Sequence, residues 1–234
     1  MKNYNKEAII LCIGLIIMGA CIADGLTSAF QSDRIVTVKG LSEREVPADK
    51  VTWPLVYKEL GNEPAEMYNR LATKNRQVID FLKEKGISEN EISESAIQVS
   101  DRQADSYDQN NILYRYKATS VITVTSSQVE LIRKIMQSQS ELMKMGIALI
   151  TEEYGTNTVK YEFTGLNEIK PDMIEESTKN ARATAEKFAK DSDSKLGKIR
   201  KASQGQFSID NRDTNTPYIK RIRVVSTIEY YIED

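Results

Sequence analysis

The chain has 234 residues, of which 40% are hydrophobic, and its 32 basic and 34 acidic side chains leave a formal net charge of -2. This length and composition suffice for a buried core in one domain or in two small ones. Because a nucleic-acid-binding protein needs a clustered basic excess to displace phosphate counterions, the near-balance of charge argues against a nucleic-acid partner.

The residues that perform much of enzyme chemistry are missing from most of the chain. Histidine is absent, and both cysteines, Cys12 and Cys21, lie in an N-terminal apolar run. After that run there are no Cys/His zinc sites, no Ser-His or Cys-His pairs and no histidine general acid or base. We therefore expect no catalytic residues, no metal and no cofactor, and the chain is predicted not to be an enzyme.

Residues 1–30 predict a signal or anchor segment, followed by a short polar linker at residues 31–34. After Lys2 and Lys6, residues 8–23 form an uncharged apolar run of sixteen residues. As a helix this run spans about 24 Å, short of a hydrocarbon core of about 30 Å unless the helix continues past Asp24. The two lysines favour a cytoplasmic N-terminus and an exported remainder.

Three fates of this segment stay open. It is an uncleaved inner-membrane anchor formed by residues 8–30, a signal cleaved near Thr27-Ser28-Ala29, or a lipoprotein signal with lipidation at Cys21. All three place the remainder in the cell envelope, on the periplasmic side. A buried core helix is the remaining alternative.

The next elements are two strands. The first is predicted at residues 35–40, with the sequence IVTVKG. In the second, Val51, Trp53, Leu55 and Tyr57 alternate with more polar residues, as on a strand with one buried face. Pro54 places this strand at a sheet edge or a bulge, because proline cannot donate a hydrogen bond to a neighbouring strand.

Alternation and helical periodicity predict the later elements. Gly86 and Gly146 close two of the predicted helices. Helices are expected at residues 64–85, 128–145 and 171–192, and strands at 96–99, 114–125, 148–152, 158–163, 198–209 and 219–232.

Residues 50–125 and 157–232 share one order of elements: strand, helix, strand, polar hairpin tip and long strand. This order predicts an α+β domain over residues 35–234. Repeated βαββ-like units would give antiparallel sheets packed by about three helices, preceded by the N-terminal hydrophobic helix.

The helix PDMIEESTKNARATAEKFAKDS has an unusually small apolar stripe. Small residues in the middle of the stripe allow a close approach to another element. That element is the domain's own sheet, a second copy of the chain, or a ligand. For a second copy, the candidate self-association residues are Ile174, Thr178, Ala181, Ala185 and Phe188.

Three segments carry a family resemblance: DRIVTVKGLSEREVPADKVTWPL, the stretch from YEFTGLNEIK to ASQGQFSI, and the terminal KRIRVVSTIEYYI. Together they resemble the SIMPL-domain family, which includes a periplasmic immunogenic antigen among its bacterial envelope proteins. The resemblance implies an α+β domain of βαββ-like units, an envelope location and self-association, and it supplies no catalytic residues. A link with oxidative-stress tolerance is proposed for bacterial members, but the exported part has no thiol to support one.

Two groups of acidic residues offer alternatives in which the protein binds a metal or hydrolyses a glycan. The polar tips hold Asp101, Asp105 and Asp108 in one case and Asp210 and Asp213 in the other, without the glycine turn and distal glutamate of an EF-hand. Glu43 and Glu45 would form a carboxylate pair for glycoside hydrolysis if burial separated their pKa values. Solvent-exposed carboxylates are the ordinary interpretation of both groups.

Tyrosines and basic clusters are alternatives for ligand binding. Tyr114, Tyr116, Tyr230 and Tyr231 would stack on sugars or, by strand preference, pack in a sheet. The clusters KIRKAS and KRIRVV would contact anionic lipid or polysaccharide, or form solvated faces.

The sequence thus predicts a non-enzymatic envelope protein that is tethered to the membrane by its N-terminal segment. We expect a self-associating scaffold or interaction module, a homo-oligomer with an unspecified envelope partner and no nucleic acid. The alternatives are an exported carboxylate-dependent hydrolase of cell-envelope glycans and a sugar- or lipid-binding module.

Overall fold

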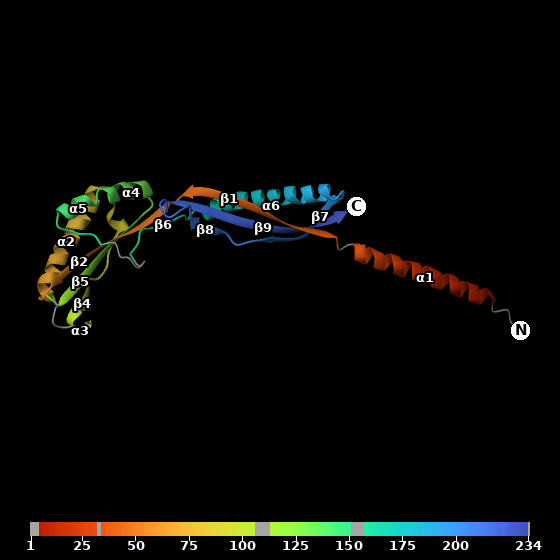
Figure 1. Cartoon of the computed structure of the whole chain (residues 1–234), viewed down its shortest axis with the longest axis horizontal. Coiled ribbons are helices and arrows are strands. Elements are labelled where there is room, and N and C mark those ends of the chain that lie inside the picture. The colour runs from red at the N-terminus through yellow and green to blue at the C-terminus, as the bar shows by residue number, and fades with distance from the viewer. Residues whose placement is uncertain (1–4, 32–33, 106–112, 151–156, 234) are drawn as a thin grey trace. The chain divides into compact units, whose positions relative to one another are not determined.

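The computed structural model describes residues 5–31, 34–105, 113–150 and 157–233. It is a mixed α+β protein with two antiparallel sheets and an apolar N-terminal helix, which confirms the predicted fold class (Figure 1). The part expected as one domain divides into two compact units. Unit 1 comprises Met1–Arg44, Ile169–Ser208 and Arg223–Asp234, and unit 2 comprises Glu45–Glu168 and Ile209–Ile222.

Helix α1, Asn5–Gln31, continues past Asp24 without a break. Its window Ala8–Leu26 has a mean hydropathy of 2.5, and none of it is buried against the rest of the chain. Nineteen residues rise about 28 Å as a helix, close to the thickness of a hydrocarbon core. The helix is therefore long and apolar enough to be a signal anchor or a membrane span.

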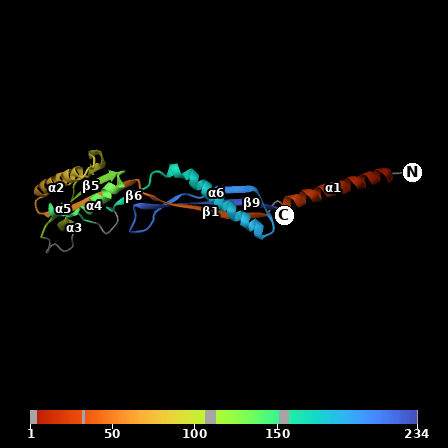
Figure 2. The ribbon, with the colours of Figure 1, turned by 90° about the horizontal axis from the view of Figure 1, so that it is seen from above.

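Apart from α1, unit 1 is one helix on one sheet. The strands of this sheet are β1 (Ile35–Pro47), β9 (Ile219–Glu233) and β7 (Lys195–Gln204) in that order. Strand β8 (Ser208–Asn211), which belongs mostly to unit 2, also pairs with β9. Helix α6 (Leu166–Asp191) runs along one face of this sheet (Figures 1 and 2). The single strand predicted at residues 198–209 is two strands, β7 and β8, because residues 205–207 between them are not in a strand.

The face of α6 that carries the small side chains lies directly on the unit 1 sheet. Its buried residues are Met173, Ser177, Ala181, Ala185 and Ala189. A Cβ atom added to Gly40 of β1 would overlap the backbone of Ser177 and Ala181 and lie 2.9 Å from the Ala181 Cβ. The Ser177 and Ser226 hydroxyls are 2.6 Å apart across the same interface. Small side chains on α6 and a glycine on β1 thus let the helix backbone approach the strand.

Helix α6 begins at Leu166, so the predicted start at Pro171 is wrong. The Asp49 carboxylate explains the earlier start. It accepts hydrogen bonds from the Thr164 amide at 2.8 and 2.9 Å, the Thr164 hydroxyl at 3.0 Å and the Gly165 amide at 3.0 Å. A carboxylate from another segment therefore holds the two residues that precede the helix and places a negative charge near its N-terminus, and Pro171 is left inside the helix.

Replacing Asp49 with alanine should lower the free energy of unfolding by about 2 kcal/mol, because the substitution removes charge-assisted hydrogen bonds at the helix start. Equilibrium denaturation of the full chain measures the change. Asp172→Ala is the matched control, since Asp172 lies on α6, is 70% exposed and approaches Arg44 only at 3.8 Å. Equal losses in the two variants would show that Asp49 does not hold the helix start.

Unit 2 has a sheet of strands β3, β5, β2 and β6, with β4 also paired to β5. Its elements in chain order are β2 (Lys50–Gly61), α2 (Pro64–Glu84), the 3-10 helix η1 (Glu89–Glu91), β3 (Ile92–Glu94), β4 (Gln98–Asp101), α3 (Arg102–Asp105), β5 (Tyr116–Ser126), α4 (Val129–Gln137), α5 (Ser140–Lys144) and β6 (Lys160–Glu162). Helices α2, α4 and α5 share one hydrophobic core with alternate residues of two strands, which are Val51, Trp53, Leu55 and Tyr57 of β2 and Ala118, Ile122 and Val124 of β5. The alternation expected in both strands is confirmed.

Two sequence expectations in unit 2 need correction. The helix predicted at 128–145 is broken into α4 and α5 around Ser138 and Gln139. Residues 148–150 of the strand predicted at 148–152 are not in a strand, and its other two residues lie outside the described part. The edge position of Pro54 is as expected, since β6 pairs only with residues 50–52 of β2.

A buried polar cluster joins α2 to the unit 2 sheet. Asn75 of α2 is 2% exposed. Its side-chain oxygen accepts hydrogen bonds from the Tyr57 hydroxyl and, at 2.9 Å, from the Ser120 hydroxyl, and its amide donates to Glu94. Burial raises the pKa of the Tyr57 phenol to about 12, the Ser120 hydrogen bond opposes that rise, and the Glu94 charge adds to it. This cluster is internal and satisfied, so it is a structural feature.

Candidate functional site

The second face of the unit 2 sheet carries polar side chains. On β2 and β5 these are the residues that alternate with the core positions. Lys58 lies opposite Thr119 across the β2–β5 pair, and Thr119 lies opposite Gln98 across the β4–β5 pair. Two residues further along each strand, Lys117 lies opposite Ser100. The pairing of three strands therefore gathers two lysines, two hydroxyls and an amide on one surface.

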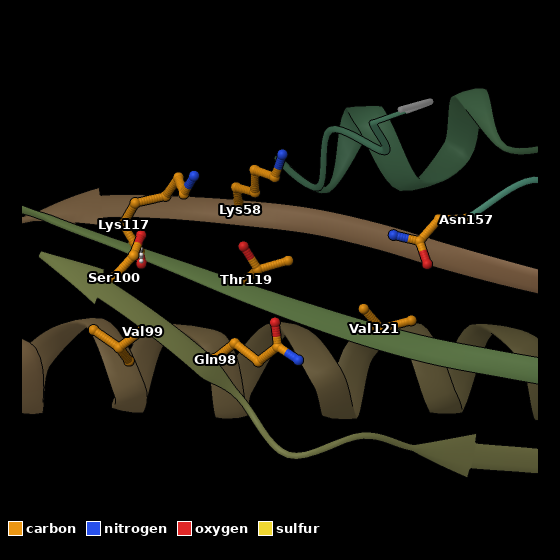
Figure 3. Close-up of a pocket in the computed structure, with 8 residues that line it drawn as sticks. All are labelled: Lys58, Gln98, Val99, Ser100, Lys117, Thr119, Val121 and Asn157. Carbon is orange, nitrogen blue, oxygen red and sulfur yellow. Dashed lines mark hydrogen bonds between the residues drawn. The ribbon is translucent and has the colours of Figure 1, made fainter. Parts of the chain in front are cut away.

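These side chains line a groove of about 490 Å³, within the usual volume range of ligand sites. We call it the lysine groove, and its residues are Lys58, Gln98, Val99, Ser100, Lys117, Thr119, Val121 and Asn157. Figure 3 shows the Lys58 and Lys117 side chains rising from the same side of the sheet as the Thr119 hydroxyl. The Ser100 hydroxyl is 3.5 Å from the Lys117 carbonyl oxygen, the one interaction drawn between lining residues.

Among the residues that the structure describes, the lining carries positive charge and no acidic side chain. The two carboxylates next to lining residues in the sequence interact with other cations. Glu59 pairs with Lys74 and lies 3.5 Å from Arg70. Asp101 pairs with Arg115 at 2.8 Å, and this hydrogen bond is the main reason that the pKa of the Asp101 carboxyl is lowered.

The arrangement can bind an anion. Lys58 and Lys117 lie on adjacent strands at diagonal positions, about 7–8 Å apart between their Cα atoms, a spacing that long side chains can bridge. Two ammonium groups with neighbouring hydroxyl and amide donors suit a carboxylate or phosphate oxygen. None of the described lining residues has a carboxylate or imidazole that would act as a general acid or base.

The match to a protein family covers both units. The sequence model of the family SIMPL, described as a protein of unknown function (DUF541), matches residues 36–224. The chain belongs to the SIMPL family. No curated protein was found to match it. The matched segment contains every residue of the lysine groove and ends within β9.

The candidate self-association residues of the SIMPL domain occupy different environments. Ala181 and Ala185 have no exposed surface, because the chain's own sheet covers them. Ile174 and Thr178 are half-buried. Phe188 is 56% exposed. In the folded chain, therefore, only the ends and flanks of the stripe are accessible to a second copy.

The residues proposed for other chemistry do not gather into a site. Glu43 and Glu45 are both exposed on β1, and Glu45 lies 3.6 Å from Arg212. Cys21 is exposed on α1 and has a free thiol. Neither glutamate is among the lining residues of the lysine groove.

The aspartates of the two polar tips take part in local structure. Asp101 accepts hydrogen bonds from the Gln103 and Ala104 amides, and Asp213 accepts them from the Asn215 and Thr216 amides. Hydrogen bonds from Thr216 are the largest cause that lowers the pKa of Asp213, to about 2. Asp105 lies at the end of α3, Asp210 is exposed in β8, and Asp108 lies outside the described residues. Among described residues no cluster of three potential metal ligands occurs.

The four tyrosines do not form one stacking surface. Tyr114 and Tyr116 belong to unit 2, whereas Tyr230 and Tyr231 belong to unit 1. Tyr230 is 4% exposed and packs beneath α6. The basic cluster KIRKAS lies exposed on β7, but in KRIRVV the Lys220 side chain is 8% exposed and the Arg221 guanidinium donates to the Arg212 carbonyl oxygen at 2.6 Å.

Sequence reasoning missed the lysine groove as a site. The alternation of β5 places Lys117 and Thr119 on its polar face, and this much could be read from the sequence. Their neighbours Lys58, Ser100 and Asn157 come from three other segments. Only the strand register brings these segments together, and a single sequence contains no direct signal for that register.

Proposed function

We propose that this SIMPL protein is a non-enzymatic, membrane-tethered envelope protein that binds a negatively charged envelope polymer through the lysine groove. The observation that carries the proposal is the groove itself, where two lysines and four uncharged hydrogen-bonding side chains converge and none of the described lining residues is acidic. An anionic polymer is the fitting ligand, since repeated carboxylates or phosphates bind lysines by charge-assisted hydrogen bonds.

The tether is supported by the apolar helix α1 at the N-terminus. The lysines near its start favour export of the two compact units. An exported domain held near a membrane meets the anionic polymers of the envelope at high local concentration, so that weak individual contacts suffice. Binding through repeated groups on one polymer would then hold the envelope layer and the membrane together.

An interaction module is favoured over the other candidates by the positions of the side chains. Self-association through the middle of the α6 stripe would require Ala181 and Ala185 to leave their own sheet. A glycan hydrolase would need two converging carboxylates with separated pKa values, whereas Glu43 and Glu45 are exposed.

Full-length protein in zwitterionic lipid nanodiscs should bind polygalacturonate or poly(glycerol phosphate) but not neutral dextran in a calorimetric titration. The two polyanions distinguish carboxylate from phosphate recognition. Lys58→Gln and Lys117→Gln should each weaken binding by about tenfold, because each removes a charge-assisted hydrogen bond. Affinity should also fall as salt is raised.

Lys160→Gln is the matched control for this titration. Lys160 is an exposed lysine on β6 of the same sheet, outside the groove lining. The proposal fails if neither polyanion binds, or if the control variant loses as much affinity as the two groove variants.

A further inference from the structure

One end of unit 1 brings four chain segments together: the start of β1, the end of β9, the end of α6 and the start of β7. The Ile232 amide donates to the Arg34 carbonyl oxygen at 2.9 Å, and Leu196 pairs with Ile232. The turn from α6 to β7 is closed by the Ser194 amide, which donates to the Ala189 carbonyl oxygen at 2.9 Å. In both ribbon views the end of α6 and the start of β1 lie at the same end of the sheet (Figures 1 and 2).

This end exposes large apolar side chains on α6 and β7. Phe188 is 56% exposed and Ile199 is 51% exposed. We call these two residues the tethered rim. Ile35 is 36% exposed but lies on the sheet face away from α6, since its neighbours Val36 and Val38 pack toward α6. Ile199 also lines a groove of about 460 Å³ between α6 and β7, together with Leu196 and Tyr230. Exposed apolar groups gathered at one end of a unit commonly mark a contact surface.

The covalent connection to α1 limits how far the tethered rim can be from a membrane. Only residues 32 and 33 separate the end of α1 at Gln31 from Arg34, where pairing with β9 begins. Three peptide steps extend at most about 10 Å, whatever their conformation. Beyond Leu26, the end of the apolar window, five more helical residues add about 7.5 Å. If α1 spans a bilayer, Arg34 is therefore within about 18 Å of the hydrocarbon boundary, a range that covers the headgroup layer of about 5–7 Å and about 10 Å beyond it.

Lysines surround the rim. Lys187, Lys190, Lys195 and Lys198 are exposed, and so are the acids Glu186, Asp191, Asp193 and Glu233. Glu186 is paired with Arg182 at 3.0 Å. Lysine stems can lie along an apolar surface while the ammonium groups reach lipid phosphates. The combination of apolar side chains and flanking lysines is the chemistry of an interfacial membrane contact.

We propose that the tethered rim contacts the lipid headgroup layer, so that unit 1 rests on the outer surface of the membrane that α1 crosses. Phe188 and Ile199 enter the interface, and the lysines bind lipid phosphates. This inference rests on the tether in the proposed function and is independent of the lysine groove. Its consequence is that the membrane surface restrains the position of unit 1.

The test uses the full chain with Cys12 and Cys21 replaced by serine and a single fluorophore attached at Lys190→Cys. The protein is reconstituted into vesicles of zwitterionic and anionic lipids that carry a headgroup quencher. The label should be strongly quenched, and Phe188→Ser with Ile199→Ser should abolish most of the quenching. A label at Lys170→Cys is the control, because Lys170 lies twenty residues earlier on α6, about 30 Å along its axis.

Flotation of the vesicles reports separately whether α1 is inserted. A chain that does not float with the vesicles contradicts both the tether and the rim contact. If the chain floats but the Lys190 label is quenched no more than the Lys170 label, the tether holds and the rim contact is wrong. Quenching that depends on protein density instead of quencher lipid would assign the rim to a second copy of the chain and overturn the proposal.

Discussion

Ala181→Leu should strongly destabilise unit 1, whereas Ala183→Leu, two residues along the same helix, should not. Ala181 has no exposed surface and lies over Gly40, whereas Ala183 is exposed. The larger side chain has no space between helix and sheet, so we expect a loss of about 3 kcal/mol in the free energy of unfolding. Thermal and urea denaturation followed by circular dichroism measure the difference.

Gly40→Ala tests the same contact from the sheet side. Its added Cβ would overlap backbone atoms of α6, which cannot rotate away as a flexible side chain can. The loss should be at least as large as for Ala181→Leu. Near-native stability in both variants, or equal losses for Ala181→Leu and Ala183→Leu, would contradict the close packing of α6 on β1.

Asn75→Ala should have the largest effect of any single polar substitution in unit 2. It removes the oxygen that accepts hydrogen bonds from the Tyr57 and Ser120 hydroxyls, and it leaves these two buried donors without an acceptor from α2. A buried unsatisfied group loses its hydration without compensation, so we expect a loss of about 3 kcal/mol. Fluorescence of Trp53 reports unfolding of this unit, because Trp53 is the single tryptophan of the chain and lies in the unit 2 core.

Asn69→Ala is the control for the buried cluster, since Asn69 lies exposed on the same helix α2. Its stability should stay within about 0.5 kcal/mol of the parent chain. If Asn75→Ala were as mild as Asn69→Ala, the cluster would contribute little to holding α2 on its sheet.

The sequence predicted those elements whose periodicity is local and uninterrupted. The alternation in β5 and β9 and the glycines after α2 and α5 were sufficient for their type and approximate ends. Gly86 and Gly146 indeed have positive φ angles of 94° and 77°. The predictions failed where a group distant in the sequence determines the local structure. The Asp49 carboxylate moves the start of α6 upstream, and no feature near Pro171 signals that contact.

The stripe of small residues on α6 shows that the same limit of sequence-based prediction applies to function. Its small residues correctly indicate a close approach, but Gly40, more than 130 residues earlier, identifies the neighbour. The lysine groove likewise depends on pairing between segments far apart in the chain. Local patterns specify elements, whereas sites formed across several strands depend on register.

Both proposals require that the two compact units lie outside the cytoplasm on an intact anchor. The direct measurement replaces Cys12 and Cys21 with serine, introduces Asn90→Cys on the exposed η1 of unit 2, and treats intact cells with a membrane-impermeant maleimide. We expect labelling in intact cells, on a chain whose mass still includes residues 1–31. Labelling only after the cells are permeabilised would place unit 2 in the cytoplasm, and a labelled chain lacking α1 would show that the protein is released from its anchor.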